Sequence, residues 1–309
     1  MQRRWFVSVI AAGALLLTGC DIGEWGDATR YKEDFHQSHP LKAGGRLYVE
    51  TFNGSIEVAG WDQETAEISG TKYASTQEGL DSLKIDIVAT GDSVRIRTIR
   101  PSERRGSMGA KFIIKVPRKT TLERLEGSNG GVRVTDVEGN ARLRTSNGGV
   151  NLTHVRGDVE ATTSNGGIEL NDVQGRAILR TSNGGIHADD VRGVFDASTS
   201  NAGVHAVIRE VEAGRTVKAH TSNGGIELTL DRVESDVEAS TSNAPVTVRL
   251  PASIAVNVKA RTSNASIHSD FDVTARGEIS KNHLEGTIGG GGRLLDLSTS
   301  NGPIRLTKL

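Results

Sequence analysis

The chain has 309 residues, of which 37 are Gly, 6 are Pro, 3 are Trp, 3 are Tyr, 6 are Phe and only one is Cys. One Cys excludes an internal disulfide and a zinc site built from thiolates alone. The formal net charge of −1, from 37 Lys and Arg against 38 Asp and Glu, excludes the basic surface of a general nucleic-acid binder, so no nucleic-acid partner is expected.

The first twenty residues are typical of a bacterial lipoprotein signal. Arg3 and Arg4 precede an apolar run over residues 5–17 that is short for a membrane span. The run ends in Leu17-Thr18-Gly19-Cys20, which resembles the lipobox, where cleavage before the Cys leaves its thiol to receive lipid. Residues 1–19 are therefore the expected signal peptide and Cys20 the expected lipidation site. The alternatives are an ordinary signal peptide or an anchor helix that happens to contain Cys.

Lipidation of Cys20 predicts that acyl chains, palmitate among them, anchor the protein in the lipid bilayer without a membrane span. Several acyl chains anchor a protein far more strongly than one. The expected location is the bacterial cell envelope, facing the periplasm or the exterior. Asp21 resembles an inner-membrane retention signal and slightly favours that membrane. Residues 20–40, the lipidated Cys and a polar segment, are predicted to form a tether with a reach of roughly 25 Å.

Residues 41–125 hold five aromatic side chains, against two in residues 126–309, and they hold the longer predicted strands. Strands are predicted around residues 47–49, 83–88, 94–99 and 112–116. We interpret this region as an N-terminal β-rich cap that continues the repeats described next and closes their exposed first edge. An uncapped edge would invite end-to-end aggregation.

An internal repeat dominates residues 126–309. Asn follows Ser in steps of 18 residues at first, then of 22, 20 and 21, and finally of 37, which we interpret as two units with one marker lost near Lys281-Asn282. The marker residues are Asn129, Asn147, Asn165, Asn183, Asn201, Asn223, Asn243, Asn264 and Asn301.

Within each unit, apolar and polar residues alternate with a period of two, which indicates two short strands. When successive units are aligned, apolar residues fall into columns. One column is Val132, Val150, Ile168, Ile186 and Val204, and another alternates as Leu143, Ala161, Leu179 and Ala197. The sequence therefore predicts an all-β fold, a β-solenoid (β-helix) of two-strand coils of about 18–22 residues, stacked about 4.8 Å apart.

The corner of each coil carries Asn followed by two small residues. We predict that the Asn side chains point inward and form a structural ladder along the stack. The two Gly residues that usually follow favour a tight corner. Pro245 and Pro303 occupy the second slot in later coils, so small size rather than a positive φ is the expected requirement.

Two outward columns have residue types that can bind metals. Glu169, His187 and His205 fall on successive coils and suit zinc, while Asp172, Asp189 and Asp190 suit calcium. A solvated strand face and turn-forming Asp residues explain the same patterns, and no metal or other cofactor is expected. No Gly-x-Ser-x-Gly motif occurs, and Gly289–Gly292 lacks the Lys of a phosphate loop, so no catalytic residue and no enzyme is predicted.

Several motifs resemble one known family. They are Gly45-x-Leu47-x-Val49, Asn53-Gly54-Ser55-Ile56-x-Val58-x-Gly60-Trp61-Asp62, Val116-Pro117 and the repeated Thr-Ser-Asn-Gly-Gly. Together they resemble the DUF4097 family, the "putative adhesin" β-strand-repeat proteins of bacterial envelopes, over residues 41–309. The resemblance implies an all-β solenoid-like fold. It implies no catalytic residue, because none is established for the family.

These observations favour a non-enzymatic envelope lipoprotein, an elongated scaffold or adhesin-like binding module whose partner is an envelope protein or a polysaccharide. The alternative is an accessory sensor or regulator of an envelope-stress signalling system. A polysaccharide-active enzyme is a weaker third hypothesis, because an 18-residue coil is narrow and its outward acidic residues are scattered.

Overall fold

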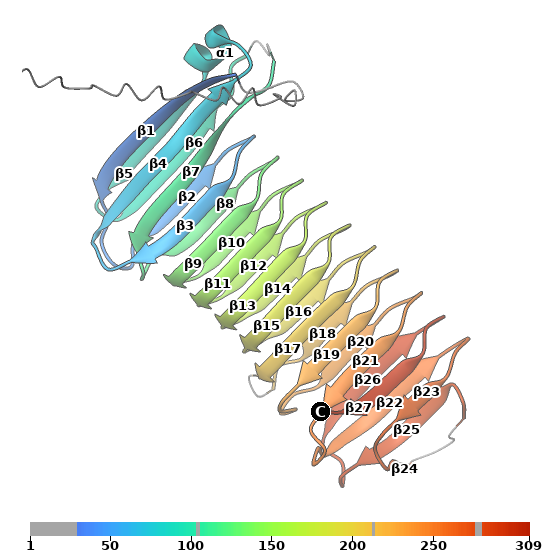
Figure 1. The fold of residues 1–309 in the computed structure, drawn as a ribbon. Helices are drawn as coiled ribbons and strands as arrows, with labels where there is room; N and C mark the ends of the chain where they lie inside the picture. Colours follow the sequence, from blue (N-terminus) through green and yellow to red (C-terminus); the bar gives the residue numbers. More distant parts are fainter. Residues whose placement is uncertain (1–29, 103–105, 212–213, 276–279) are drawn as a thin grey trace, which may run out of the picture.

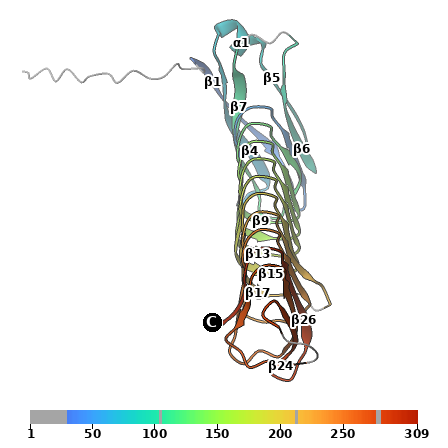
Figure 2. The ribbon, with the colours of Figure 1, turned by 90° about the vertical axis from the view of Figure 1, so that its right-hand side faces the viewer.

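The computed structural model describes residues 30–102, 106–211, 214–275 and 280–309. The predicted signal peptide, Cys20 and the first part of the predicted tether lie outside these residues. Two long sheets face each other across a narrow core and form an elongated stack (Figures 1 and 2). The predicted all-β solenoid of two-strand coils is confirmed. Among the described residues, none of the helices is long and apolar enough to cross a membrane.

Each repeat contributes one strand to each sheet, and neighbouring coils pair in parallel. In the 13-stranded sheet, here sheet A, the repeat strands are β9 (Val132–Glu138), β11 (Val150–Arg156), β13 (Ile168–Gln174), β15 (Ile186–Arg192), β17 (Val204–Glu210), β19 (Ile226–Leu230) and β21 (Val246–Leu250). In the 14-stranded sheet B they are β8 (Thr121–Glu126), β10 (Ala141–Arg144), β12 (Val159–Thr162), β14 (Ala177–Arg180), β16 (Phe195–Ser198), β18 (Val217–His220) and β20 (Val237–Ser240).

The core consists of the predicted columns. Val150 pairs with Val132 on one side and Ile168 on the other, and all three are buried. Leu and Ala alternate in register along β10, β12, β14 and β16 of sheet B, so Leu179 stacks between Ala161 and Ala197. Phe195 is fully buried because its neighbour Ala177 is small.

The N-terminal end of the stack is built from β1 (Tyr31–Pro40), β2 (Arg46–Glu50), β3 (Ile56–Trp61), β4 (Thr65–Ala74), α1 (Gln77–Ser82), β5 (Lys84–Thr90), β6 (Ser93–Ile99) and β7 (Met108–Pro117). The coil made by β2 and β3 lies between the β6–β7 coil and the β8–β9 coil, although it comes first in the sequence. The short helix α1 was not predicted; Thr76 caps it by accepting a hydrogen bond from the backbone N–H of Gly79 at 3.0 Å.

The predicted tether over residues 20–40 is wrong for residues 31–40. These form β1, which pairs antiparallel with β4 over its whole length. The Phe35 ring packs edge-on against Phe112, with 5.9 Å between the ring centroids. A polar strand is stable here because it lies at the edge of the sheet, where one side of the strand remains in water.

The C-terminal end consists of β22 (Val256–Thr262), β23 (Ile267–Ser269), β24 (Thr274–Ala275), β25 (His283–Ile288), β26 (Arg293–Thr299) and β27 (Ile304–Lys308). The interpretation of the 37-residue step as two repeats is wrong. β25 runs antiparallel to β22, and the last coil, β26 and β27, returns to a place between β20–β21 and β22–β23. Left-handed backbone at Gly289, Gly290 and Gly291 makes the turn that permits this return.

Candidate binding groove beside the asparagine ladder

The Asn side chains at the coil corners form a continuous hydrogen-bonded ladder. From Asn129 onward, each Nδ2 donates to the Oδ1 of a neighbouring rung at 2.5–2.9 Å. At the first rung, Asn53, Nδ2 donates to the carbonyl of Met108 at 2.8 Å. In spatial order the rungs are Asn53, Asn129, Asn147, Asn165, Asn183, Asn201, Asn223, Asn243, Asn301 and Asn264. Sequence reasoning missed Asn53, which shares the Asn-Gly pair of the marker but lacks the preceding Thr-Ser.

The predicted inward direction of the Asn side chains is wrong, since the nine predicted rungs are all exposed. The inward polar group is the Thr two residues earlier. Thr163 is buried, donates from Oγ1 to the carbonyl of Gly148 at 2.9 Å and accepts from the N–H of Gly166 at 3.3 Å. The chain bends after this Thr, because Ser164 and Asn165 both donate their N–H to the carbonyl of Ser146. The bend breaks the strand alternation and turns Asn outward.

Close approach of neighbouring coils explains the first glycine of each corner. A Cβ on Gly148 would lie 1.9 Å from the carbonyl oxygen of Gly130, and the backbone of Gly148 is not left-handed, which agrees with the prediction of small size.

Left-handed backbone occurs at the opposite corner, at Asp136, His154, Asp172 and Asp190, with φ of 49–57°. Asp and His tolerate this conformation better than most residues, which accounts for that column without a bound ion.

A groove runs along the stack on the sheet A side of the ladder. It has a volume of about 590 Å³ and crosses β3, β9, β11, β13 and β15, a distance of about 19 Å at the usual strand spacing. Its lining combines exposed corner glycines with an outward polar column. The glycines are Gly131, Gly149, Gly167 and Gly185, and the column is Glu57, Arg133, Asn151, Glu169 and His187.

The column of Glu169, His187 and His205, whose residue types suit zinc, makes pairwise contacts along the stack. The rings of His187 and His205 lie parallel with centroids 4.9 Å apart, and Nδ1 of His205 lies 3.4 Å from Glu227. Glu169 turns the other way and accepts a hydrogen bond from Asn151 at 2.8 Å. Within the part of the chain that the structure describes, no three His, Cys, Asp or Glu side chains are grouped to hold a metal ion.

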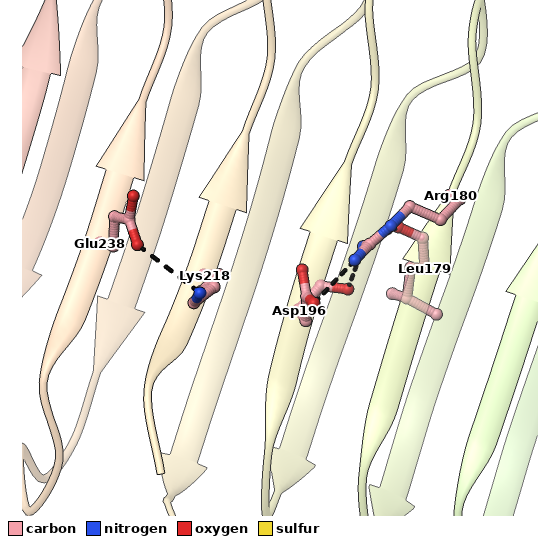
Figure 3. Close-up of polar contacts among 5 residues, drawn as sticks. All are labelled: Leu179, Arg180, Asp196, Lys218 and Glu238. Carbon is pink, nitrogen blue, oxygen red and sulfur yellow. Dashed lines mark hydrogen bonds and ion pairs between the residues drawn. The ribbon is translucent and has the colours of Figure 1, made fainter.

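The outer face of sheet B carries ion pairs between neighbouring coils (Figure 3). Arg180 donates from Nη2 to Asp196 Oδ2 at 2.7 Å and from Nη1 to the carbonyls of Leu179 and Asp196. Further along the stack, Lys218 lies 3.9 Å from Glu238. In each of these pairs, opposite charges on neighbouring coils offset one another.

A family model described as "Toastrack DUF4097" matches residues 42–307. The chain belongs to the DUF4097 family. The resemblance predicted from the corner motifs is thus confirmed. No curated protein matches the chain.

Two solved structures are similar to the chain at low identity. One is a "putative cell adhesion protein" from Clostridium sporogenes, 12% identical, covering 90% of this chain and 100% of its own, with a TM-score of 0.24. The other is a "putative adhesin" from Bacteroides fragilis, 13% identical, covering 90% of this chain and 97% of its own, with a TM-score of 0.44.

Among the described residues of this DUF4097 chain, the groove is one arrangement that can hold another molecule. Its floor is backbone without side chains, and one polar side chain per coil offers hydrogen bonds or charge along its length. Sequence reasoning did not predict it. The column of corner glycines can be seen in the sequence. Whether it forms a groove depends on the spacing of the outward side chains on adjacent coils, which the sequence does not give. Cys20 lies outside the described residues.

Proposed function

We propose that this protein is a non-enzymatic binding module of the bacterial envelope, anchored to a membrane by lipid on Cys20. The observation that carries the proposal is the groove, whose lining repeats once per coil in one direction along the stack. A lining of this kind suits an elongated partner, and the partner class we propose is polysaccharide. Its hydroxyl groups can pair with the Arg, Asn, Glu and His side chains that follow one another along the groove.

The anchor supports the same function through distance. β1 begins at Tyr31, eleven residues after Cys20, and eleven residues can span at most about 40 Å. A stack whose sheet A has 13 strands extends about 58 Å. The N-terminal coils and the groove would therefore stay close to the membrane, while the C-terminal coils would extend away from it.

Anchoring is tested by fractionation of cells that express Cys20→Ala. We expect this variant to leave the membrane fraction and to lose detergent partitioning. Asp21→Ala is the matched control, because it retains the acylated thiol and should remain membrane-bound. Unchanged partitioning of Cys20→Ala would refute the anchor.

Binding is tested by co-sedimentation of the protein with isolated envelope polysaccharide. Gly149→Trp should fill the groove without disturbing the fold, because a Cβ there meets only ordinary contacts, the nearest at 3.5 Å. Arg144→Trp, on the exposed outer face of sheet B, is the control. We expect a loss of about tenfold or more for Gly149→Trp alone. Equal binding by both variants would overturn the proposal, and cross-linking only to membrane signalling proteins would favour the regulatory alternative.

A further inference from the structure

A second hollow lies where the asparagine ladder begins, at the N-terminal end of the groove. It has a volume of about 780 Å³ and is lined by Lys32, Asp34, Asn53, Thr71, Tyr73, Ser107, Lys111 and Asn129. Asn53 lines this hollow, and Ser55, two residues further along the chain, lines the groove. The two depressions therefore adjoin on the same side of the stack.

The register of three neighbouring strands builds the hollow. Thr71 on β4 pairs with Asp34 on β1 and with Lys111 on β7, so the three lie in one row across the sheet. In the next row, Lys32 pairs with Tyr73, which pairs with Gly109. A Cβ on Gly109 would lie 2.6 Å from the Tyr73 hydroxyl, so the glycine makes room for that hydroxyl.

The hollow retains positive charge that neighbouring residues do not neutralise. Lys72 on β4 pairs with Glu33 at 2.7 Å, and Lys115 on β7 pairs with Glu67 at 3.6 Å. Lys32 and Lys111 are exposed, and neither forms an ion pair with any residue that the structure describes. The single carboxylate in the lining, Asp34, accepts a hydrogen bond from Thr71 Oγ1 at 2.6 Å. Two ammonium groups therefore face one carboxylate.

Neutral hydroxyl groups complete the lining. Burial raises the pKa of the Tyr73 hydroxyl, which therefore stays protonated at neutral pH and can donate a hydrogen bond. Ser107 adds an exposed hydroxyl on the same hollow. Ammonium groups recognise a carboxylate or phosphate, and hydroxyls both donate to and accept from sugar hydroxyls.

We propose that this hollow binds the acidic sugar of a saccharide, carrying a carboxylate or a phosphate, between Lys32 and Lys111. The saccharide continues into the groove, so this inference rests on the proposed binding function and specifies its ligand class. In this arrangement the two lysines bind the acidic sugar at one end of the ligand, and the groove binds the sugars that follow it.

The test is titration calorimetry with three probes, namely a galacturonate oligomer, a phosphorylated sugar and a neutral galactose oligomer of the same length. The double variant Lys32→Gln/Lys111→Gln should bind the acidic probe at least about tenfold more weakly than the unmodified protein, because both ammonium groups that would bind the acidic group are removed. Lys84→Gln/Lys119→Gln is the matched control, because it removes two exposed lysines elsewhere and changes net charge equally. The acidic probe that binds identifies carboxylate or phosphate as the ligand group.

Equal weakening in both double variants would show general charge attraction and overturn the proposed site. Absence of binding by both acidic probes would overturn it as well. A third outcome separates the two proposals. If the neutral oligomer binds as well as the acidic probes, loses its binding in Gly149→Trp and keeps it in the lysine variants, the acidic site is wrong. The proposed polysaccharide binding then stands.

Discussion

Asn301 donates from Nδ2 to Oδ1 of Asn243 at 2.8 Å, although 58 residues separate them in the chain. Asn264, which comes between them in the sequence, donates to Asn301 from the other side at 2.7 Å. The last coil is thus inserted between two earlier ones. The first coil is inserted in the same way, as the bond from Asn129 to Asn53 indicates. Both inserted coils have neighbours on each side. Antiparallel strands form the sheet edges at β1, β5 and β24, whereas the edge strand β23 pairs in parallel with β27.

The inserted C-terminal coil should be important for stability. Leu297→Ala removes a side chain that is 0% exposed in β26 and should reduce the free energy of unfolding by about 2–5 kcal/mol. Leu294→Ala, in the same strand but 39% exposed, should change it by less than about 0.5 kcal/mol. Urea denaturation measures both. Similar small losses for the two variants would contradict the insertion of this coil into the core.

The buried Thr column should contribute more to stability than the exposed Asn ladder. Thr163→Val leaves the carbonyl of Gly148 and the N–H of Gly166 without their partner, and should cost about 1–3 kcal/mol. Asn165→Ala should cost about 0.5–1 kcal/mol, because water can replace its exposed hydrogen bonds. Ser164→Ala is the neutral control. A larger loss for Asn165→Ala than for Thr163→Val in thermal unfolding would reverse this ranking.

Glycine should be required at Gly175, in the left-handed corner, and dispensable at Gly149, the second position after the corner Asn. Gly175 has a φ of 138°, and a Cβ there would lie 2.4 Å from the carbonyl oxygen of Gly157. Gly175→Ala should therefore lower stability by about 1–3 kcal/mol. Gly149→Ala, which has room for a Cβ, should leave the unfolding midpoint unchanged or slightly higher. Equal tolerance at the two positions would argue against the left-handed corner.

The two ion pairs on the outer face of sheet B should differ in strength. Arg180 makes two hydrogen bonds to Asp196 across the coil boundary and a third to the carbonyl of Leu179 in its own strand, whereas Lys218 lies 3.9 Å from Glu238. A double-mutant cycle should give a coupling of about 0.5–1 kcal/mol for Arg180 with Asp196 and close to zero for Lys218 with Glu238. Added salt should reduce the first coupling. Equal couplings would indicate that the geometry of Arg180 adds nothing.

The coil length, the apolar columns and the alternation of Leu and Ala could all be predicted, because equal spacing in sequence becomes direct contact when coils stack in register. The family could be predicted from the same corner motifs. The direction of the Asn side chains could not, since both Thr163 and Asn165 have inward parity in an extended strand. Only the bend between them, stabilised by the shared carbonyl of Ser146, distinguishes their directions.

The sequence by itself determined the repeating coil, since a short period leaves each residue only the equivalent residues above and below as neighbours. The tertiary structure decided the features that lie outside the repeat. The placement of β26 and β27 between earlier coils depends on the edge that remains to be paired once the chain reaches its end. The pairing of residues 31–40 with β4 depends on a distant strand, which local polarity cannot indicate. The hollow between Lys32 and Lys111 likewise exists only because the register of β1, β4 and β7 brings together lysines far apart in the chain.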